Sequence, residues 1–179
     1  LAGATHLRNH VWSDELVFWK DVTSKSPGKW RAHNNLGTVY YKRGEFGKAA
    51  QSFKDSIRIK QNFADSHYNL SNAYRNLGML DMAIAECELA LTFNPQKMNA
   101  RNNLGLMYYE KGWNEEAIEM FKSVLEAEPE NYMTRNNLGL AYASAGLIDQ
   151  AIAEFEHSLA IKPGFADAND NLRSMRSRS

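Results

Sequence analysis

An asparagine stands immediately before a repeated leucine in five successive segments of the chain. The five residues recur every 34 positions, at Asn35, Asn69, Asn103, Asn137 and Asn171. A carboxamide carries two N–H donors and one oxygen acceptor, and these groups complement the C=O and N–H of a peptide backbone. A column of such side chains could therefore hold an extended peptide with little dependence on the sequence of that peptide.

The neighbours of this column would supply the remaining contacts of a binding groove. The position before each of the first four asparagines holds Asn34, Tyr68, Asn102 and Asn136. One turn after the asparagines lie Thr38, Asn72, Leu106 and Leu140, and a further turn brings Tyr41, Arg75 and Tyr109. Tyrosine and arginine often dominate the binding energy of interfaces. A structural interpretation stays open beside this one, in which the asparagines bridge neighbouring helices and bind no ligand.

Residues that catalyse reactions or bind metals form no recognisable motif in the sequence. There is no Gly-rich phosphate loop, no nucleophile elbow and no paired-carboxylate pattern. His33 and His67 occupy equivalent repeat positions, where we expect them to pack against neighbouring side chains. Cys87 is the only cysteine, so it cannot form an internal disulfide, and we expect an inert buried thiol. The sequence thus predicts no catalytic residue, no metal site and no cofactor, and a chain that is not an enzyme by itself.

The overall charge and hydropathy exclude two further classes of partner. Lys and Arg number 21, Asp and Glu also number 21, and the net charge is zero, so no general attraction to nucleic acid is indicated. The longest apolar runs are far shorter than the roughly 20 residues of a membrane-spanning helix. We therefore expect neither nucleic-acid binding nor direct membrane insertion of this segment.

Two helices per repeat must position the asparagine column. In the first half of each repeat, Leu36 and Tyr40 are four residues apart, which is the spacing of a helical face. Gly44 then ends this helix, because glycine adopts the left-handed conformation at low cost. In the second half, an apolar residue at every fourth position predicts a second amphipathic helix. We expect Asp81 and Asp149 to cap two of these second helices.

The pattern resembles the tetratricopeptide repeat (TPR) family, with repeats at 30–63, 64–97, 98–131 and 132–165. The residues that carry the resemblance are Leu36-Gly37, Tyr40, Gly44, Ala49 and Phe53 with their equivalents, and the closing Pro95, Pro129 and Pro163. Three positions depart from it, namely Ser71 for glycine, Cys87 for the aromatic residue and Gln61 for proline. The resemblance implies an all-α fold, a right-handed α-solenoid of antiparallel helical hairpins. Residues 1–29 are expected to form a degenerate half-repeat, and 166–179 a capping helix and tail.

The N-terminal flank carries a second resemblance. Its order of residues is similar to that of multi-spanning, mannosyltransferase-like membrane proteins with an extracytoplasmic TPR tail. The residues are Arg8-Asn9, Trp12-x-Asp14-Glu15, Trp19-x-Asp21, Ser26-Pro27 and Arg31-Ala32-His33-Asn34-Asn35-Leu36-Gly37. This resemblance implies that the chain is the soluble C-terminal part of such a protein. Without it, a cytoplasmic location is equally compatible with the sequence.

Three functions follow from these patterns. The first is a non-catalytic scaffold that binds a protein or extended peptide of unknown identity, and its asparagine column resembles the ladder of the O-linked N-acetylglucosamine transferase family. The second is an accessory domain that presents a protein substrate to a membrane-bound glycosyltransferase. The third is weak self-association through an apolar patch that includes Trp12, Trp19 and Trp30.

Overall fold

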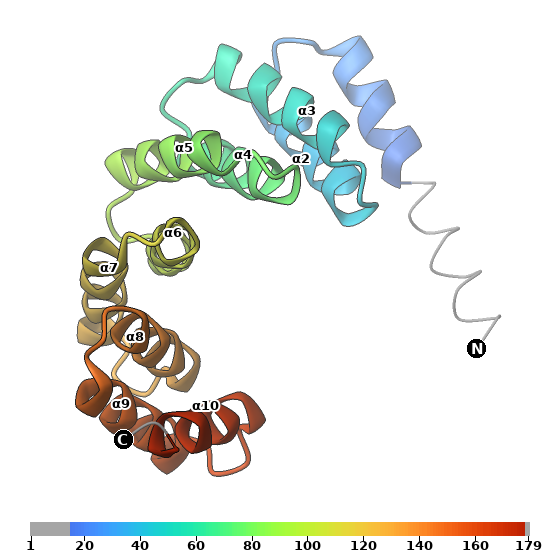
Figure 1. Ribbon diagram of the computed structural model, residues 1–179. Helices are drawn as coiled ribbons and strands as arrows, with labels where there is room; N and C mark the ends of the chain where they lie inside the picture. The colour runs from blue at the N-terminus through green and yellow to red at the C-terminus, as the bar shows by residue number, and fades with distance from the viewer. Residues whose placement is uncertain (1–14, 178–179) are drawn as a thin grey trace, which may run out of the picture. The chain divides into compact units, whose positions relative to one another are not determined.

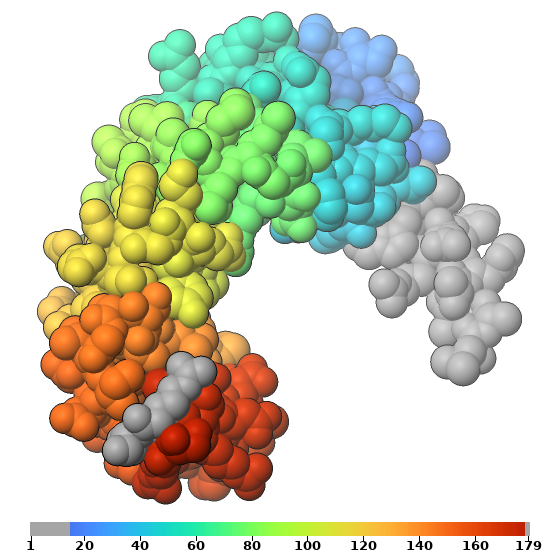
Figure 2. All heavy atoms as spheres, in the orientation of Figure 1, coloured from blue at the N-terminus to red at the C-terminus, as the bar shows by residue number. Residues whose placement is uncertain are grey.

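The structure is a computed structural model that describes residues 15–177 (Figure 1). All regular elements of these residues are α-helices. The chain divides after Pro95 into two compact units, which are described separately. On the face seen in Figure 2, the atoms of neighbouring helices within each unit lie against one another.

The first unit consists of stacked helical hairpins. A helix through residues 15–25 is followed by α2 (Trp30–Lys42), α3 (Phe46–Ile59), α4 (Ala64–Asn76) and α5 (Leu80–Phe93). Helix α2 packs against α3, α4 packs against α5, and α3 also contacts α4. We call α2 and α4 first helices, and α3 and α5 second helices.

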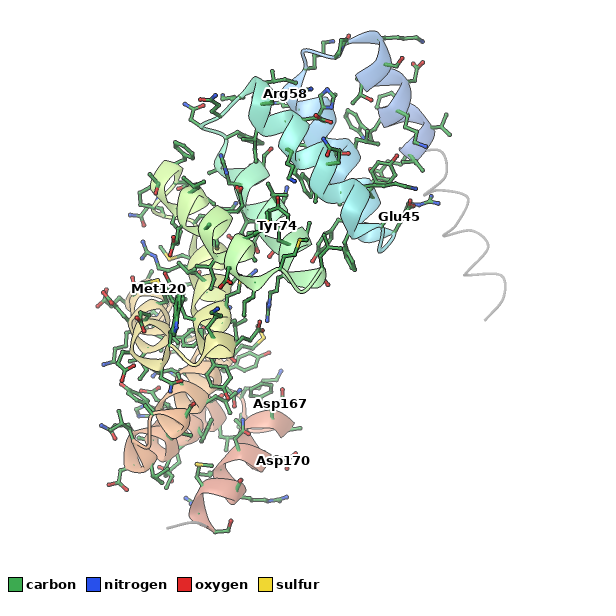
Figure 3. All side chains as sticks on the ribbon, turned by 45° about the horizontal axis from the view of Figure 1, so that its top comes forward. Glu45, Arg58, Tyr74, Met120, Asp167 and Asp170 are labelled. Carbon is green, nitrogen blue, oxygen red and sulfur yellow. The ribbon has the colours of Figure 1, made fainter. Side chains whose placement is uncertain are left out.

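The second unit repeats this arrangement and adds one helix. Its elements are α6 (Met98–Lys111), α7 (Asn114–Ala127), α8 (Tyr132–Ser144), α9 (Ile148–Ile161) and α10 (Ala166–Arg176). Here α6 and α8 are first helices, and α7 and α9 are second helices. Helix α10 packs against α8 and α9, burying Leu172 and Met175. Its acidic residues Asp167 and Asp170 are exposed (Figure 3).

A small residue of each first helix packs directly on a side chain of the second helix that follows. A Cβ atom added to Gly37 would lie 2.6 Å from the ring of Phe53. The equivalent distances are 2.7 Å from Gly105 to Phe121 and 2.6 Å from Gly139 to Phe155. Real Cβ atoms do not approach so closely, so the buried phenylalanine requires glycine opposite it.

In the second repeat, the same contact between the first and second helix is formed by a different pair of small side chains. Ser71 stands in place of the glycine, Cys87 in place of the phenylalanine, and both are fully buried. The Ser71 hydroxyl donates a hydrogen bond of 2.7 Å to the Ala83 carbonyl, which satisfies this polar group. Burial raises the pKa of the Cys87 thiol to about 12, so the thiol is neutral and inert, as expected.

Each hairpin turns at a glycine with a left-handed backbone. Gly112 follows α6 with φ of 77°, a value that an L side chain rarely adopts. Replacing Gly112 with alanine should cost about 1 kcal/mol of unfolding free energy, measured by urea titration. Gly47 is the control, because it lies in helix α3 with open space around it and has no left-handed backbone. Gly47→Ala should leave stability equal or slightly higher, and an equal loss in both variants would contradict the argument.

The expected capping by Asp81 and Asp149 is wrong. Met79 and Leu147 occupy the N-cap positions of α5 and α9, and neither forms a side-chain cap hydrogen bond. Both helices start two residues earlier than a capping aspartate would require. Both aspartates therefore lie inside the first turn, where their charge is favourable next to the helix N-terminus.

Candidate functional site

The asparagine column lies on first helices, at the border of their buried face. In α2 the buried side chains are Ala32, Leu36, Val39 and Tyr40. At 100° per residue, Thr38 falls on the opposite side of the helix, whereas Asn35 lies at the edge of the buried face. All five asparagines of the column are partly exposed in the structure. Each unit therefore presents part of the column on what we call its first-helix face.

Some of the amides bridge consecutive first helices. In the first unit, Asn69 Nδ2 donates to Asn34 Oδ1 at 3.1 Å. The Ser66 hydroxyl donates to the same oxygen at 3.1 Å, and Ser66 is 2.8 Å from the Ser56 hydroxyl of α3. Asn34 thus accepts two hydrogen bonds from α4, so the structural interpretation of the asparagines applies to this pair.

The second unit repeats the bridge with small variations. Asn171 Nδ2 of α10 donates to Asn136 Oδ1 of α8 at 2.9 Å. The Thr134 hydroxyl of α8 donates to Asn102 Oδ1 of α6 at 3.1 Å. In both units the donor belongs to the later helix and the acceptor to the earlier one.

Asn35 and Asn137 behave differently from these bridging residues. Within residues 15–177, neither side chain forms a hydrogen bond with another residue. Each amide keeps both N–H groups and its oxygen for water or a ligand. The sequence could not separate these two asparagines from Asn69 and Asn171, because all four occupy the same repeat position.

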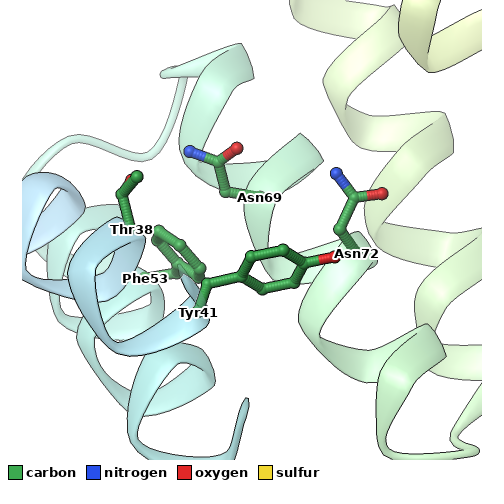
Figure 4. Close-up of a pocket in the computed structure, with 5 residues that line it drawn as sticks. All are labelled: Thr38, Tyr41, Phe53, Asn69 and Asn72. Atoms are coloured by element: carbon green, nitrogen blue, oxygen red, sulfur yellow. The ribbon is translucent and has the colours of Figure 1, made fainter. Parts of the chain in front are cut away.

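A small cavity opens on the first-helix face of the first unit (Figure 4). Its volume is about 40 Å³, and its lining residues are Thr38, Tyr41, Phe53, Asn69 and Asn72. The ring of Tyr41 packs edge-on against Phe46 at 5.2 Å, and its hydroxyl accepts a hydrogen bond of 2.9 Å from Asn76. The structure therefore brings together two predicted site residues, Tyr41 and Asn69. Phe53, assigned to the core from its periodicity, forms part of the same cavity.

The equivalent positions of the second unit hold larger apolar side chains. Leu106 and Leu140 replace Thr38 and Asn72, and both pack against the core of this unit together with Tyr109. The predicted contacts Leu106 and Tyr109 are thus partly buried in packing. Tyr68 and Arg75 of the first unit are partly exposed and already engaged in interactions of their own.

The histidine of the second repeat, His67, bonds to a carbonyl of the turn before α4. His67 is 5% exposed, and its Nε2 lies 2.7 Å from the Gln61 carbonyl oxygen. Its Nδ1 lies 2.7 Å from the Glu86 carboxylate of α5. Burial disfavours the charged ring, but the hydrogen bonds to Glu86 and Gln61 outweigh it and raise the pKa of His67. Both neighbours are acceptors, so a ring that donates from both nitrogens fits this site best.

Arg135 occupies the equivalent position in the fourth repeat. Its Nε donates to the Pro129 carbonyl at 3.1 Å, and another guanidinium nitrogen donates to Glu154 at 3.1 Å. In the first repeat, His33 lies 2.9 Å from the Pro27 carbonyl. We use the name turn clamp for the contact between the side chain at this repeat position (His33, His67 or Arg135) and the carbonyl oxygen of the preceding turn. The packing role expected for the histidines was therefore incomplete, because each also bonds a turn carbonyl.

An apolar pocket of about 530 Å³ lies at the N-terminal end of the first unit. Its lining includes Phe18, Trp19, Val22 and Trp30, and the side chain of Phe18 is 56% exposed. Trp12, which the sequence placed in the same patch, lies outside the described residues, as do Arg8 and Asn9. No helix of the described part could span a membrane, being too short or too polar.

Comparisons with known proteins identify the repeat. Sequence models described as TPR repeat or tetratricopeptide repeat match residues 37–78, 64–97 and 102–164. The chain is also 34% identical over 61 residues to Protein O-mannosyl-transferase Tmtc2 of Drosophila melanogaster. This match covers 34% of the chain and 6% of Tmtc2, so the similarity concerns a small part of that protein.

Solved structures share the fold. MamA superposes with a TM-score of 0.81 at 24% identity, over 90% of this chain and 88% of MamA. YrrB, described as a TPR protein with an unusual peptide-binding site, superposes with a TM-score of 0.83 at 20% identity, over 93% of this chain and 86% of YrrB. These likenesses confirm the all-α solenoid fold class of antiparallel helical hairpins.

Proposed function

The chain belongs to the tetratricopeptide repeat family, whose repeats are typically non-catalytic interaction scaffolds. We propose that the first-helix face of each unit binds an extended protein segment. The observation that carries the proposal is the pair Asn35 and Asn137, whose amides have no hydrogen-bonding partner among the described residues. Amides that are partly exposed and unpaired can pair with the C=O and N–H of a peptide at little reorganisation cost. The peptide-binding site named for YrrB is a precedent on the same fold.

The experiment compares the unpaired asparagines, Asn35 and Asn137, with an asparagine that bridges two helices. A random twelve-residue peptide library displayed on phage is selected against the chain, and the affinities of selected peptides are measured by fluorescence polarisation. Asn35→Ala should weaken by about fivefold the binding of peptides held by the first unit, and Asn137→Ala that of peptides held by the second unit, since each variant removes hydrogen bonds worth about 1 kcal/mol. Neither should change the unfolding free energy by more than about 0.5 kcal/mol, because no hydrogen bond to another described residue is lost.

Asn69→Ala is the comparison for stability at the same repeat position, and its binding is not used as a control. It removes the bond to Asn34, so it should lower the unfolding free energy by about 1 kcal/mol. The proposal fails if no peptide is selected, or if Asn35→Ala and Asn137→Ala both bind selected peptides as tightly as the unmodified chain.

The similarity to Tmtc2 favours a second candidate function. In this case the chain would be the accessory domain of a membrane-bound glycosyltransferase and would present a protein substrate to it. The gene sequence upstream of Leu1 provides the test. Several encoded apolar segments of about 20 residues would support this function, whereas an upstream region without them would exclude it.

The N-terminal apolar pocket is the basis of the self-association candidate. Sedimentation measurements over a hundredfold range of concentration decide this case. A mass that rises with concentration, and falls back in a Phe18→Ser variant, would support self-association. A constant monomer mass would remove it.

A further inference from the structure

The small cavity of the first unit combines an apolar floor with polar walls. Phe53 is 1% exposed and contributes the edge of its ring. The walls come from Thr38 and Tyr41 of α2 and from Asn69 and Asn72 of α4, and no charged side chain lines the cavity (Figure 4). An acidic or basic group would therefore lose its hydration without gaining an ionic partner. The volume of about 40 Å³ admits only a few heavy atoms.

The polar walls include a donor on Tyr41 and an acceptor on Asn69 that face the same cavity. The Tyr41 hydroxyl already accepts a hydrogen bond from Asn76, and its own proton remains for a second partner. Asn69 uses one N–H on Asn34, and its Oδ1 accepts no hydrogen bond from any residue between 15 and 177. A hydroxyl group matches this pair, because its oxygen can accept from Tyr41 while its proton is donated to Asn69.

We propose that this cavity selects a threonine side chain of the bound segment. The threonine hydroxyl would lie between Tyr41 and Asn69, and its methyl group would contact the Phe53 ring. Valine has the same shape but would leave both polar walls without a partner, and buried unpaired groups are costly. Serine would keep the hydroxyl and lose the apolar contact. This inference rests on the proposed function, since it names one side chain of the same bound segment.

The second unit shows how the cavity can be closed. Leu106 and Leu140 stand where the first unit has Thr38 and Asn72, and both pack against their own core. The chain thus accepts leucine at these positions of the repeat. Thr38→Leu is therefore a filling variant that should fold normally, and Tyr41→Phe removes the donor with almost no change of shape.

The test uses the peptides selected from the phage library. Threonine should be enriched at one position of these peptides. Synthetic versions with threonine and valine at that position should differ by about tenfold in affinity for the unmodified chain, because valine leaves Tyr41 and Asn69 unpaired. In Tyr41→Phe this preference should fall to about threefold or less, and in Thr38→Leu the peptide should bind weakly with either residue. The control is the unfolding free energy, which should stay within about 1 kcal/mol of the unmodified chain in both variants, since Tyr41→Phe also loses the bond from Asn76.

The possible failures are distinguishable. Selected peptides that depend on Asn35 or Asn137 but show no threonine enrichment would overturn the inference and leave the proposed function standing. A threonine preference that survives unchanged in Tyr41→Phe would also overturn it. If the library yields no binding peptide, both the inference and the proposed function are wrong.

Discussion

Replacing Cys87 with phenylalanine should destabilise the chain by about 2–3 kcal/mol, although phenylalanine is the residue of the other three repeats. In those repeats a Cβ opposite the ring would lie 2.6–2.7 Å from it, and only glycine avoids this overlap. The second repeat has Ser71 at that position, so the new ring would press against the serine Cβ. Overpacking a buried site typically costs 1–3 kcal/mol, and Ser71 is fully buried.

A second substitution should reverse this loss. Ser71→Gly together with Cys87→Phe recreates the pair of the other repeats, and we expect stability within about 1 kcal/mol of the unmodified chain, or above it. Ser71→Gly alone should cost about 1–2 kcal/mol, through a small cavity and the lost bond to Ala83. Urea unfolding of the four proteins forms a double-mutant cycle, and a coupling energy below 0.5 kcal/mol would show that the two positions are independent.

Removing the turn clamp at His67 should have an effect of similar size. His67→Ala deletes a buried ring and leaves the Gln61 carbonyl and the Glu86 carboxylate without their donor, so we expect a loss of about 2–4 kcal/mol near pH 6. The measurement is the urea unfolding free energy of the variant and of the unmodified chain.

The contribution of His67 should also depend on pH. Its pKa is raised in the folded chain, so the charged ring stabilises the fold fully below the unfolded pKa of about 6.5. This stabilisation is lost as the pH rises through the folded pKa. The matched variant is His67→Arg, because Arg135 and Glu154 show that arginine can form the same clamp. The stability of His67→Arg relative to the unmodified chain should therefore increase from pH 6 to pH 9. A constant difference would contradict the argument.

The helical repeat could be predicted from the sequence because its determinants are local. Leucine, tyrosine and glycine at fixed spacing define a buried face and a turn, and few other folds bury such a face. Each departure in the second repeat, Ser71 and Cys87, could also be recognised as small or apolar. The mutual dependence of Ser71 and Cys87 could not be predicted from the sequence. Their contact joins two helices, and its closeness follows from the position of the phenylalanine ring in the other repeats, which only the structure gives.

Which asparagines bridge helices could not be predicted from the sequence, for a different reason. A carboxamide fits a bridge between helices and a peptide ligand equally well. Asn69 and Asn35 share one repeat position, yet only Asn69 donates to an earlier first helix. Asn69 donates to Asn34 on the preceding first helix, whereas the residue equivalent to Asn34 in the second unit, Asn102, accepts from Thr134 and not from Asn137. The repeat position therefore does not decide the partner. The aspartate caps failed for a related reason, because helix starts are accurate only to within one or two residues.

The turn clamp should influence which helical hairpin unfolds locally first. Its residues are His33 and His67 in the first unit, while Arg135 serves in the second. Arginine stays charged at all ordinary pH values, whereas a neutral histidine can donate from only one of its nitrogens. Mildly alkaline conditions should therefore loosen α4 and α5 selectively, and local opening of repeat proteins follows such local differences. In hydrogen exchange, the amides of this hairpin would then lose protection before those of α8 and α9.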